Sequence, residues 1–145
     1  WRMEVTHSSD GVVLVNDAYN ANPASTRAAL KSLAAMSAGG RSWAVLGEML
    51  ELGDSSTDAH DSIGRLAVRL DISRLVAVGE GARPIHMGAA HEGSWGEEST
   101  WVPDTEAAVA LLRAELRPGD VVLVKASRSV GLEKVVEALM DGGTS

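Results

Sequence analysis

Four short apolar runs constrain the fold of this chain more than any other feature of its sequence. Each run is rich in Val and Leu or other apolar residues, and none of them alternates apolar with polar residues. Strands of this kind are typically buried on both faces, as in a parallel sheet that is covered by helices. The runs are residues 12–15, 43–46, 75–78 and 121–124. Weaker strands are expected at residues 2–6 and 100–102.

Stretches with helical periodicity fill the gaps between these runs. Asn22 and Pro23 are typical of a helix start, and Asp104 is typical of another. The expected helices are residues 23–37, 58–70, 104–116 and 131–140, whereas residues 79–84 indicate a tight turn and residues 88–99 a surface loop. This alternation predicts an α/β fold: a Rossmann-like, mostly parallel, doubly wound sheet that is flanked by helices on both faces. We expect residues 1–145 to form a single domain.

Composition and charge exclude several classes of protein. A formal net charge of −7 disfavours binding to nucleic acid or to an anionic membrane surface. No apolar run approaches the roughly 20 residues that a membrane-spanning helix needs, so no membrane insertion is expected. The absence of cysteine excludes disulfides and thiolate zinc sites, and it fits a cytoplasmic protein. Because the chain begins with Trp1 and not with Met, we expect it to be part of a longer protein.

Polar residues gather where the expected strands end. In an open α/β sheet, ligands bind at the carboxyl ends of the strands. The residues that follow the strands there include Asp17, Glu48, Glu80, Lys125 and Arg128. Every fold of this kind also needs polar turns, so the pattern alone does not decide between a binding site and ordinary loops.

Standard catalytic and phosphate-binding motifs are incomplete or missing. No Gly-Lys-Ser/Thr segment is present, so the chain has no P-loop. The Gly-x-Gly at Gly79 and Gly81 lacks the third glycine of a dinucleotide-binding fingerprint and has Pro84 there instead. The histidines do not have the spacing of a zinc site, no metal-binding residue is assigned, and His60 is expected to be solvated in the first turn of a helix. The chain therefore lacks a complete active site of its own.

Three segments resemble signatures of the Mur ligases, a family of ATP-dependent ligases. They are residues 17–25, DAYNANPAS, residues 46–53, LGEMLELG, and residues 124–128, VKASR. Their order and spacing agree with the family over essentially the whole chain, and the first segment is similar to that of the members that add D-alanyl-D-alanine. One departure is Ala126, where the family usually has glycine, so a left-handed backbone is not expected there.

The resemblance implies the third domain of a three-domain enzyme. Such an enzyme joins D-alanyl-D-alanine to UDP-N-acetylmuramoyl-tripeptide, a peptidoglycan precursor, through an acyl phosphate, while ATP is cleaved. The N-terminal and central domains of the same chain would hold most of the ATP and the Mg²⁺. This domain would close over them and contribute contacts to the nucleotide and the dipeptide, and it would be inactive alone.

The resemblance also assigns roles to single residues. Asp17, at the end of a strand, would accept hydrogen bonds from the ribose hydroxyls, although an Asp there could also form a turn with its own backbone. Lys125 and Arg128 would be catalytic and, together with Ser127, would bind the dipeptide carboxylate or the acyl phosphate; ordinary surface salt bridges are the alternative. Glu48, Glu51 and His60 are interpreted as structural. The cofactor-binding residues would be Arg2, Asp17, Tyr19, Asn20 and Asn22, of which Asn22 could equally be a helix cap and Tyr19 could pack between domains.

The residues alone leave three alternative functions open. A folylpolyglutamate-synthase-like ligase shares the architecture but not the segment at residues 17–25. A phospho-receiver domain has a similar size, but it needs an acidic pair after its first strand and an Asp after its third, where this chain has a lone Asp17 and Gly79-Glu80. A plain interaction domain is the third.

Overall fold

The fold is a six-stranded sheet between two layers of helices. The computed structural model describes residues 4–8, 10–18, 21–93, 98–127 and 130–142. The strands are β1 (Glu4–His7), β2 (Val13–Asp17), β3 (Ser42–Leu46), β4 (Arg74–Val78), β5 (Ser99–Val102) and β6 (Val121–Lys125). The helices are α1 (Pro23–Met36), α2 (Ser56–Arg69), α3 (Arg83–Glu92), α4 (Thr105–Glu115) and α5 (Glu133–Gly142), with short 3₁₀ turns η1 (Gly53–Ser55) and η2 (Glu80–Ala82).

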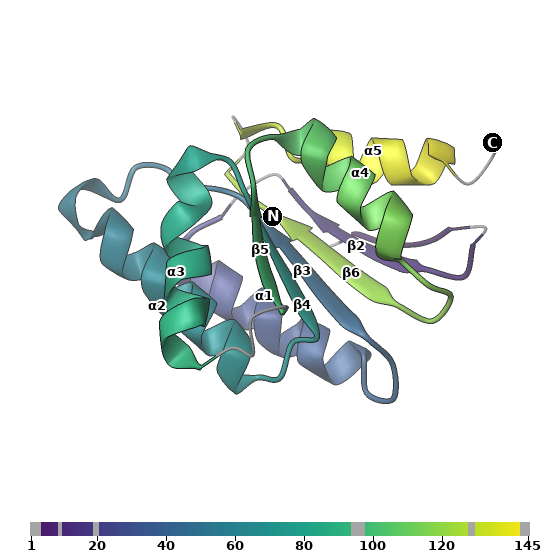
Figure 1. The fold of residues 1–145 in the computed structure, drawn as a ribbon, viewed down its shortest axis with the longest axis horizontal. Helices are drawn as coiled ribbons and strands as arrows, with labels where there is room; N and C mark the ends of the chain where they lie inside the picture. The colour runs from purple at the N-terminus through teal and green to yellow at the C-terminus, as the bar shows by residue number, and fades with distance from the viewer. Residues whose placement is uncertain (1–3, 9, 19–20, 94–97, 128–129, 143–145) are drawn as a thin grey trace.

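The strands lie in the order β1-β2-β6-β3-β4-β5. All neighbours are parallel except β1, which pairs antiparallel with β2 at the edge of the sheet. Helices α1, α2 and α3 cover one face, and α4 and α5 cover the other, as Figure 1 shows. The prediction of a mostly parallel, doubly wound α/β fold is confirmed.

Burial on both faces explains why the strands are continuously apolar. In β6, Leu123 belongs to the cluster under α1, α2 and α3, while its neighbours Val122 and Val124 belong to the cluster under α4 and α5. Successive side chains of a central strand point to opposite faces of the sheet, and helices cover both faces. No position within the strand is therefore exposed to water, so none favours a polar residue until the strand ends.

The start of α1 agrees with its sequence signals. Asn22 is the N-cap, and its side chain accepts a hydrogen bond from the Ser25 backbone N–H at 2.8 Å. Ser25 Oγ in return accepts from the Asn22 N–H at 3.1 Å, which completes a capping box. Pro23 occupies the first helical position, where a missing N–H costs nothing.

Helix α3 contradicts the expected loop over residues 88–99. It runs from Arg83 to Glu92 and ends at Gly93, whose φ of 110° is a left-handed cap. Pro84 lies in the first turn, where proline is tolerated, and so it starts the helix and does not only mark a turn. Gly88 weakens the helical pattern in the sequence, but it lies where α3 contacts α2: a Cβ there would overlap the carbonyl oxygen of Asp61. Tertiary packing therefore outweighs the low helix propensity of glycine.

No helix in the described part of the chain has the length and the apolar composition to cross a membrane.

Candidate functional site

The ends of β2 and β6 bring Asp17 and Lys125 together. The two strands are parallel neighbours, and these residues are register partners. Lys125 Nζ donates a hydrogen bond to Asp17 Oδ2 at 2.6 Å, and the side chains are only 0% and 4% exposed. Removing one member of such a buried pair typically costs about 3–5 kcal/mol, because the other charge is left unpaired. The two residues form one unit at the carboxyl edge of the sheet.

Of the two carboxylate oxygens of Asp17, one is bound to Lys125 and the other has no partner among the described residues. The Ala18 N–H donates to Asn16 Oδ1 at 3.1 Å, so Asn16 forms a local side-chain turn here. Asp17 Oδ1 has no hydrogen-bond partner among the residues that the structure describes. A carboxylate oxygen in this position can accept one further hydrogen bond from a ligand hydroxyl.

Ser127 joins three loops at the same edge. Its Oγ accepts from the Leu50 N–H at 2.8 Å and lies 3.5 Å from the Ala21 carbonyl oxygen. Its own N–H donates to the Glu48 carbonyl oxygen at 3.1 Å. Ser127 therefore ties the loop after β6 to the loops after β3 and β2, and its predicted contact with substrate stays a prediction.

The loop around Ala126 has the expected backbone. The described non-glycine residues with positive φ are Glu51 and Asp71, so Ala126 is not left-handed, as predicted. Its side chain is fully buried. Gly47 makes room for it, because a Cβ on Gly47 would lie 2.8 Å from the Ala126 Cβ. The absence of a side chain at Gly47, directly after β3, therefore leaves space for the methyl group of Ala126.

The burial of His60 contradicts the prediction that this side chain is solvated. It is fully buried, not solvated, because α2 begins at Ser56 and so places His60 on the inner face of the helix. Its Nε2 accepts from the Met49 N–H at 2.9 Å, and its Nδ1 lies 2.7 Å from the Ser56 carbonyl oxygen. The sequence carried no signal that separated this histidine from an exposed one.

The other predicted site residues divide into two groups. Asn22 caps α1 through its side chain, so the capping alternative holds, and its role with a nucleotide stays a prediction. Four others lie outside the described residues: Arg2, Tyr19, Asn20 and Arg128.

Comparison with known proteins decides the family. The family model described as "Mur ligase, glutamate ligase domain" matches residues 1–128. The chain belongs to the Mur ligase family. It is 55% identical over 98% of its length to the UDP-N-acetylmuramoyl-tripeptide--D-alanyl-D-alanine ligase of Mycobacterium leprae, and 55% identical over 99% to that of Mycobacterium tuberculosis. The chain spans 30% and 31% of the length of these relatives.

Solved structures of Mur ligases share the fold. A MurF ligase from Thermotoga maritima in complex with ADP has a TM-score of 0.78 and 28% identity over 97% of this chain, which corresponds to 30% of that protein. MurF from Acinetobacter baumannii has a TM-score of 0.81 and 28% identity over 95% of this chain and 29% of its own. The resemblance to Mur ligases is thereby confirmed, and the phospho-receiver alternative is excluded.

The described residues of this Mur ligase domain include a buried carboxylate that can accept hydrogen bonds, but no cluster of metal ligands. In the ranges that the structure describes, no group of three or more His, Asp or Glu residues is arranged to hold a metal. A carboxylate oxygen such as Asp17 Oδ1 can accept a hydrogen bond from a ribose hydroxyl, whereas the chain has no P-loop lysine for the phosphates. The chemistry of Asp17 is therefore compatible with the sugar of a nucleotide, and its assignment to the nucleotide stays a prediction.

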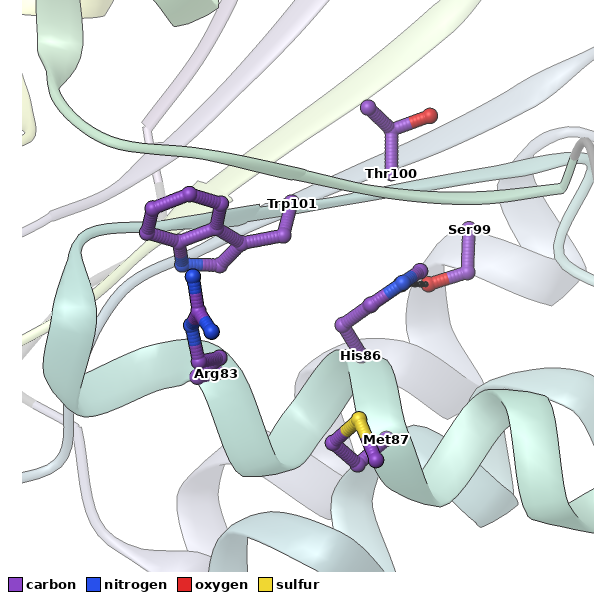
Figure 2. A pocket seen from close by; sticks show the side chains of 6 residues that line it. All are labelled: Arg83, His86, Met87, Ser99, Thr100 and Trp101. Atoms are coloured by element: carbon purple, nitrogen blue, oxygen red, sulfur yellow. Dashed lines mark hydrogen bonds between the residues drawn. The ribbon is translucent and has the colours of Figure 1, made fainter.

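An open pocket of about 450 Å³ lies between α3 and the edge strand β5 (Figure 2). Arg83 lies 4.3 Å from the ring centroid of Trp101, and Ser99 Oγ is 2.6 Å from His86 Nδ1. Burial, and after it the nearby Arg83 guanidinium, lowers the pKa of His86, which favours its neutral form. The pocket could not be predicted from the sequence, because residues 88–99 were expected to form a loop and not part of α3.

Proposed function

We propose that this chain is the C-terminal domain of a longer, ATP-dependent and Mg²⁺-dependent ligase that adds D-alanyl-D-alanine to UDP-N-acetylmuramoyl-tripeptide. The observation that carries the proposal is the 55% identity, over 98% of the chain, to a relative of that name. The N-terminal and central domains of the same protein are its partners, and they hold most of the ATP and the metal ion. The reaction supplies peptidoglycan precursors and takes place in the cytoplasm, where ATP is available.

The chain contributes fixed polar groups to this reaction. Asp17 accepts a hydrogen bond from a ribose hydroxyl through Oδ1, while Lys125 fixes its Oδ2. In this proposal Arg128 and Ser127 bind the carboxylate of the dipeptide, whose amine attacks the acyl phosphate of the tripeptide. Cations that are fixed before the reaction stabilise the negative charge that develops during this attack, since they need no reorganisation.

The proposal is tested on the full-length protein with Asp17→Asn, which keeps the size of the side chain. We expect phosphate release that depends on both the tripeptide donor and D-alanyl-D-alanine. We expect Asp17→Asn to raise the KM for ATP by about tenfold, because one charged hydrogen bond is lost. The exposed carboxylate Asp10, in the β1–β2 turn, provides the matched control Asp10→Asn, which should leave that KM unchanged.

Two results would contradict the proposal in different ways. Absence of phosphate release with the wild-type protein and D-alanyl-D-alanine would reject the function. An unchanged KM for ATP in Asp17→Asn would remove Asp17 from the nucleotide site. Lys125→Met, alone and combined with Asp17→Asn, then shows whether the two residues act as a pair, since the effects of contacting residues do not add.

A further inference from the structure

The loop between β3 and α2 is held by two side chains on successive backbone amides. His60 Nε2 accepts from the Met49 N–H at 2.9 Å, and Ser127 Oγ accepts from the Leu50 N–H at 2.8 Å. His60 comes from α2 and Ser127 from the segment after β6, so the loop is fixed from two elements. Glu51, next in the loop, has a φ of 63°, which is an unfavourable conformation for a non-glycine residue and needs such support.

Both ring nitrogens of His60 are used, in a single tautomer. Nε2 accepts from an amide, so the proton is on Nδ1, which donates to the Ser56 carbonyl oxygen at 2.7 Å. The Ser56 contact is local to α2, four residues away, whereas the Met49 contact reaches eleven residues back into the loop. An apolar side chain could fill the same space in the core, but it would leave the Met49 N–H unsatisfied.

The loop carries a carboxylate at the edge of the sheet. Glu48 is half-buried beside Gly81, where a Cβ would overlap its carboxyl group. Its carboxylate has no hydrogen-bond partner among the described side chains and backbone groups. The loop follows β3, and β6 separates β3 from β2 and Asp17. A negative group here attracts an ammonium and repels a polyphosphate, so of the two ligands in the proposed function the loop suits the amine better than the nucleotide.

We infer that His60 is a positioning residue: through the Met49 amide it fixes the loop that carries Glu48 against the incoming dipeptide. This inference rests on the proposed function, and it goes beyond it by giving a buried histidine a role in binding the nucleophile. His60 itself touches no substrate.

Two substitutions separate the two hydrogen bonds of His60. The side-chain oxygen of Gln can take the place of Nε2, so His60→Gln keeps the acceptor for Met49 and loses the Ser56 contact. The side-chain amide of Asn lies near the place of Nδ1, so His60→Asn keeps the Ser56 contact and releases the loop. His91→Asn, at an exposed position of α3, is the control.

The experiment measures the full-length protein in two ways. In His60→Asn we expect the KM for D-alanyl-D-alanine to rise about tenfold, with the KM for ATP unchanged. We also expect faster hydrogen exchange of the amides of residues 47–52. His60→Gln should keep the dipeptide KM within about twofold of the wild type and the exchange close to it.

The results separate the inference from the proposed function. Hydrogen exchange does not depend on activity, so an unaltered loop in His60→Asn overturns the positioning role even if the protein proves to act on another substrate. Equal losses in both variants, in parallel with their melting temperatures, would show a merely structural histidine and overturn it too. If His60→Asn does not fold, His60→Gln still decides, because a raised dipeptide KM in that variant contradicts the inference.

Discussion

A buried carboxylate, Asp120, fixes the amino end of the central strand β6, as the Asp17–Lys125 pair does at the carboxyl end. At the amino end of β6, Asp120 Oδ2 accepts from Trp43 Nε1 at 2.9 Å and from Arg41 Nη2 at 2.8 Å. It also accepts from the Arg117 N–H at 2.9 Å. Burial alone would raise the pKa of Asp120, but the hydrogen bonds from these three groups outweigh it and lower the pKa. Asp120 thus locks the turn before β6 to β3.

Asp120→Asn should lower the free energy of unfolding of this chain by about 2 kcal/mol at neutral pH, since charged hydrogen bonds are lost. Because the pKa of Asp120 is lower in the folded state, its contribution is fully present above the unfolded pKa of about 3.9 and is lost as the pH falls through the folded pKa. Urea unfolding followed by Trp fluorescence should show a constant difference from the wild type above about pH 5 that closes in acid. A difference that persists at about pH 2 would contradict the role of the charge, and Asp10→Asn is the control.

The residues of the site could be predicted more readily than their partners. Asp17 and Lys125 follow apolar strands, so their place at the carboxyl edge could be predicted. Their ion pair could not, because it joins residues 108 positions apart and depends on β6 lying beside β2. The burial of His60 could not be predicted either, because it depends on where α2 begins and on which loop covers the side chain.

At the scale of elements, α2 and α3 are in unusually close contact. A Cβ on Gly64 would overlap the Ile85 carbonyl oxygen, and one on Gly88 would overlap that of Asp61. At the ends of the helices, Glu92 lies 2.7 Å from Arg69 and 3.3 Å from Arg65. The glycines let the backbones approach, and the charged side chains border that contact. The glycine that made α3 hard to predict is therefore also the residue through which α3 packs.

The sign of the change in the free energy of unfolding in Gly88→Ala distinguishes the effect of packing from that of helix propensity. Propensity alone predicts that alanine stabilises α3 by about 1 kcal/mol. Overpacking against Asp61 predicts a net loss of about 1–3 kcal/mol in the free energy of unfolding, because the carbonyl is backbone and cannot move aside cheaply. We expect the loss, measured by urea unfolding. Ala90→Gly, at an exposed position on the same helix, reports propensity alone; a stabilised Gly88→Ala protein would contradict the close packing.

At the scale of the whole molecule, the sequence predicted the layers but not the order of the strands. Continuous apolar strands that alternate with helices require a covered parallel sheet. They do not say that the last strand, β6, lies in the middle between β2 and β3. That insertion places the loops after β2, β6 and β3 side by side, and it therefore creates the candidate site out of three separate motifs.

The whole molecule also sets what this chain can do alone. It spans 30% of the length of its Mycobacterium leprae relative, has no P-loop, and carries a net charge of −7 that repels a nucleotide. Under the proposed function its contacts would be limited to the ribose and the dipeptide, too few to offset the cost of immobilising ATP. We therefore expect isothermal titration of the 145-residue chain to give an affinity for ATP that is about millimolar or weaker.

We also expect no phosphate release by this chain alone with the tripeptide donor and D-alanyl-D-alanine. Covalent restoration of the remaining domains should restore turnover, because a linker raises the effective concentration for closure. Phosphate release by this chain alone, above a Lys125→Met control, would contradict the prediction and require a phosphate site within these residues.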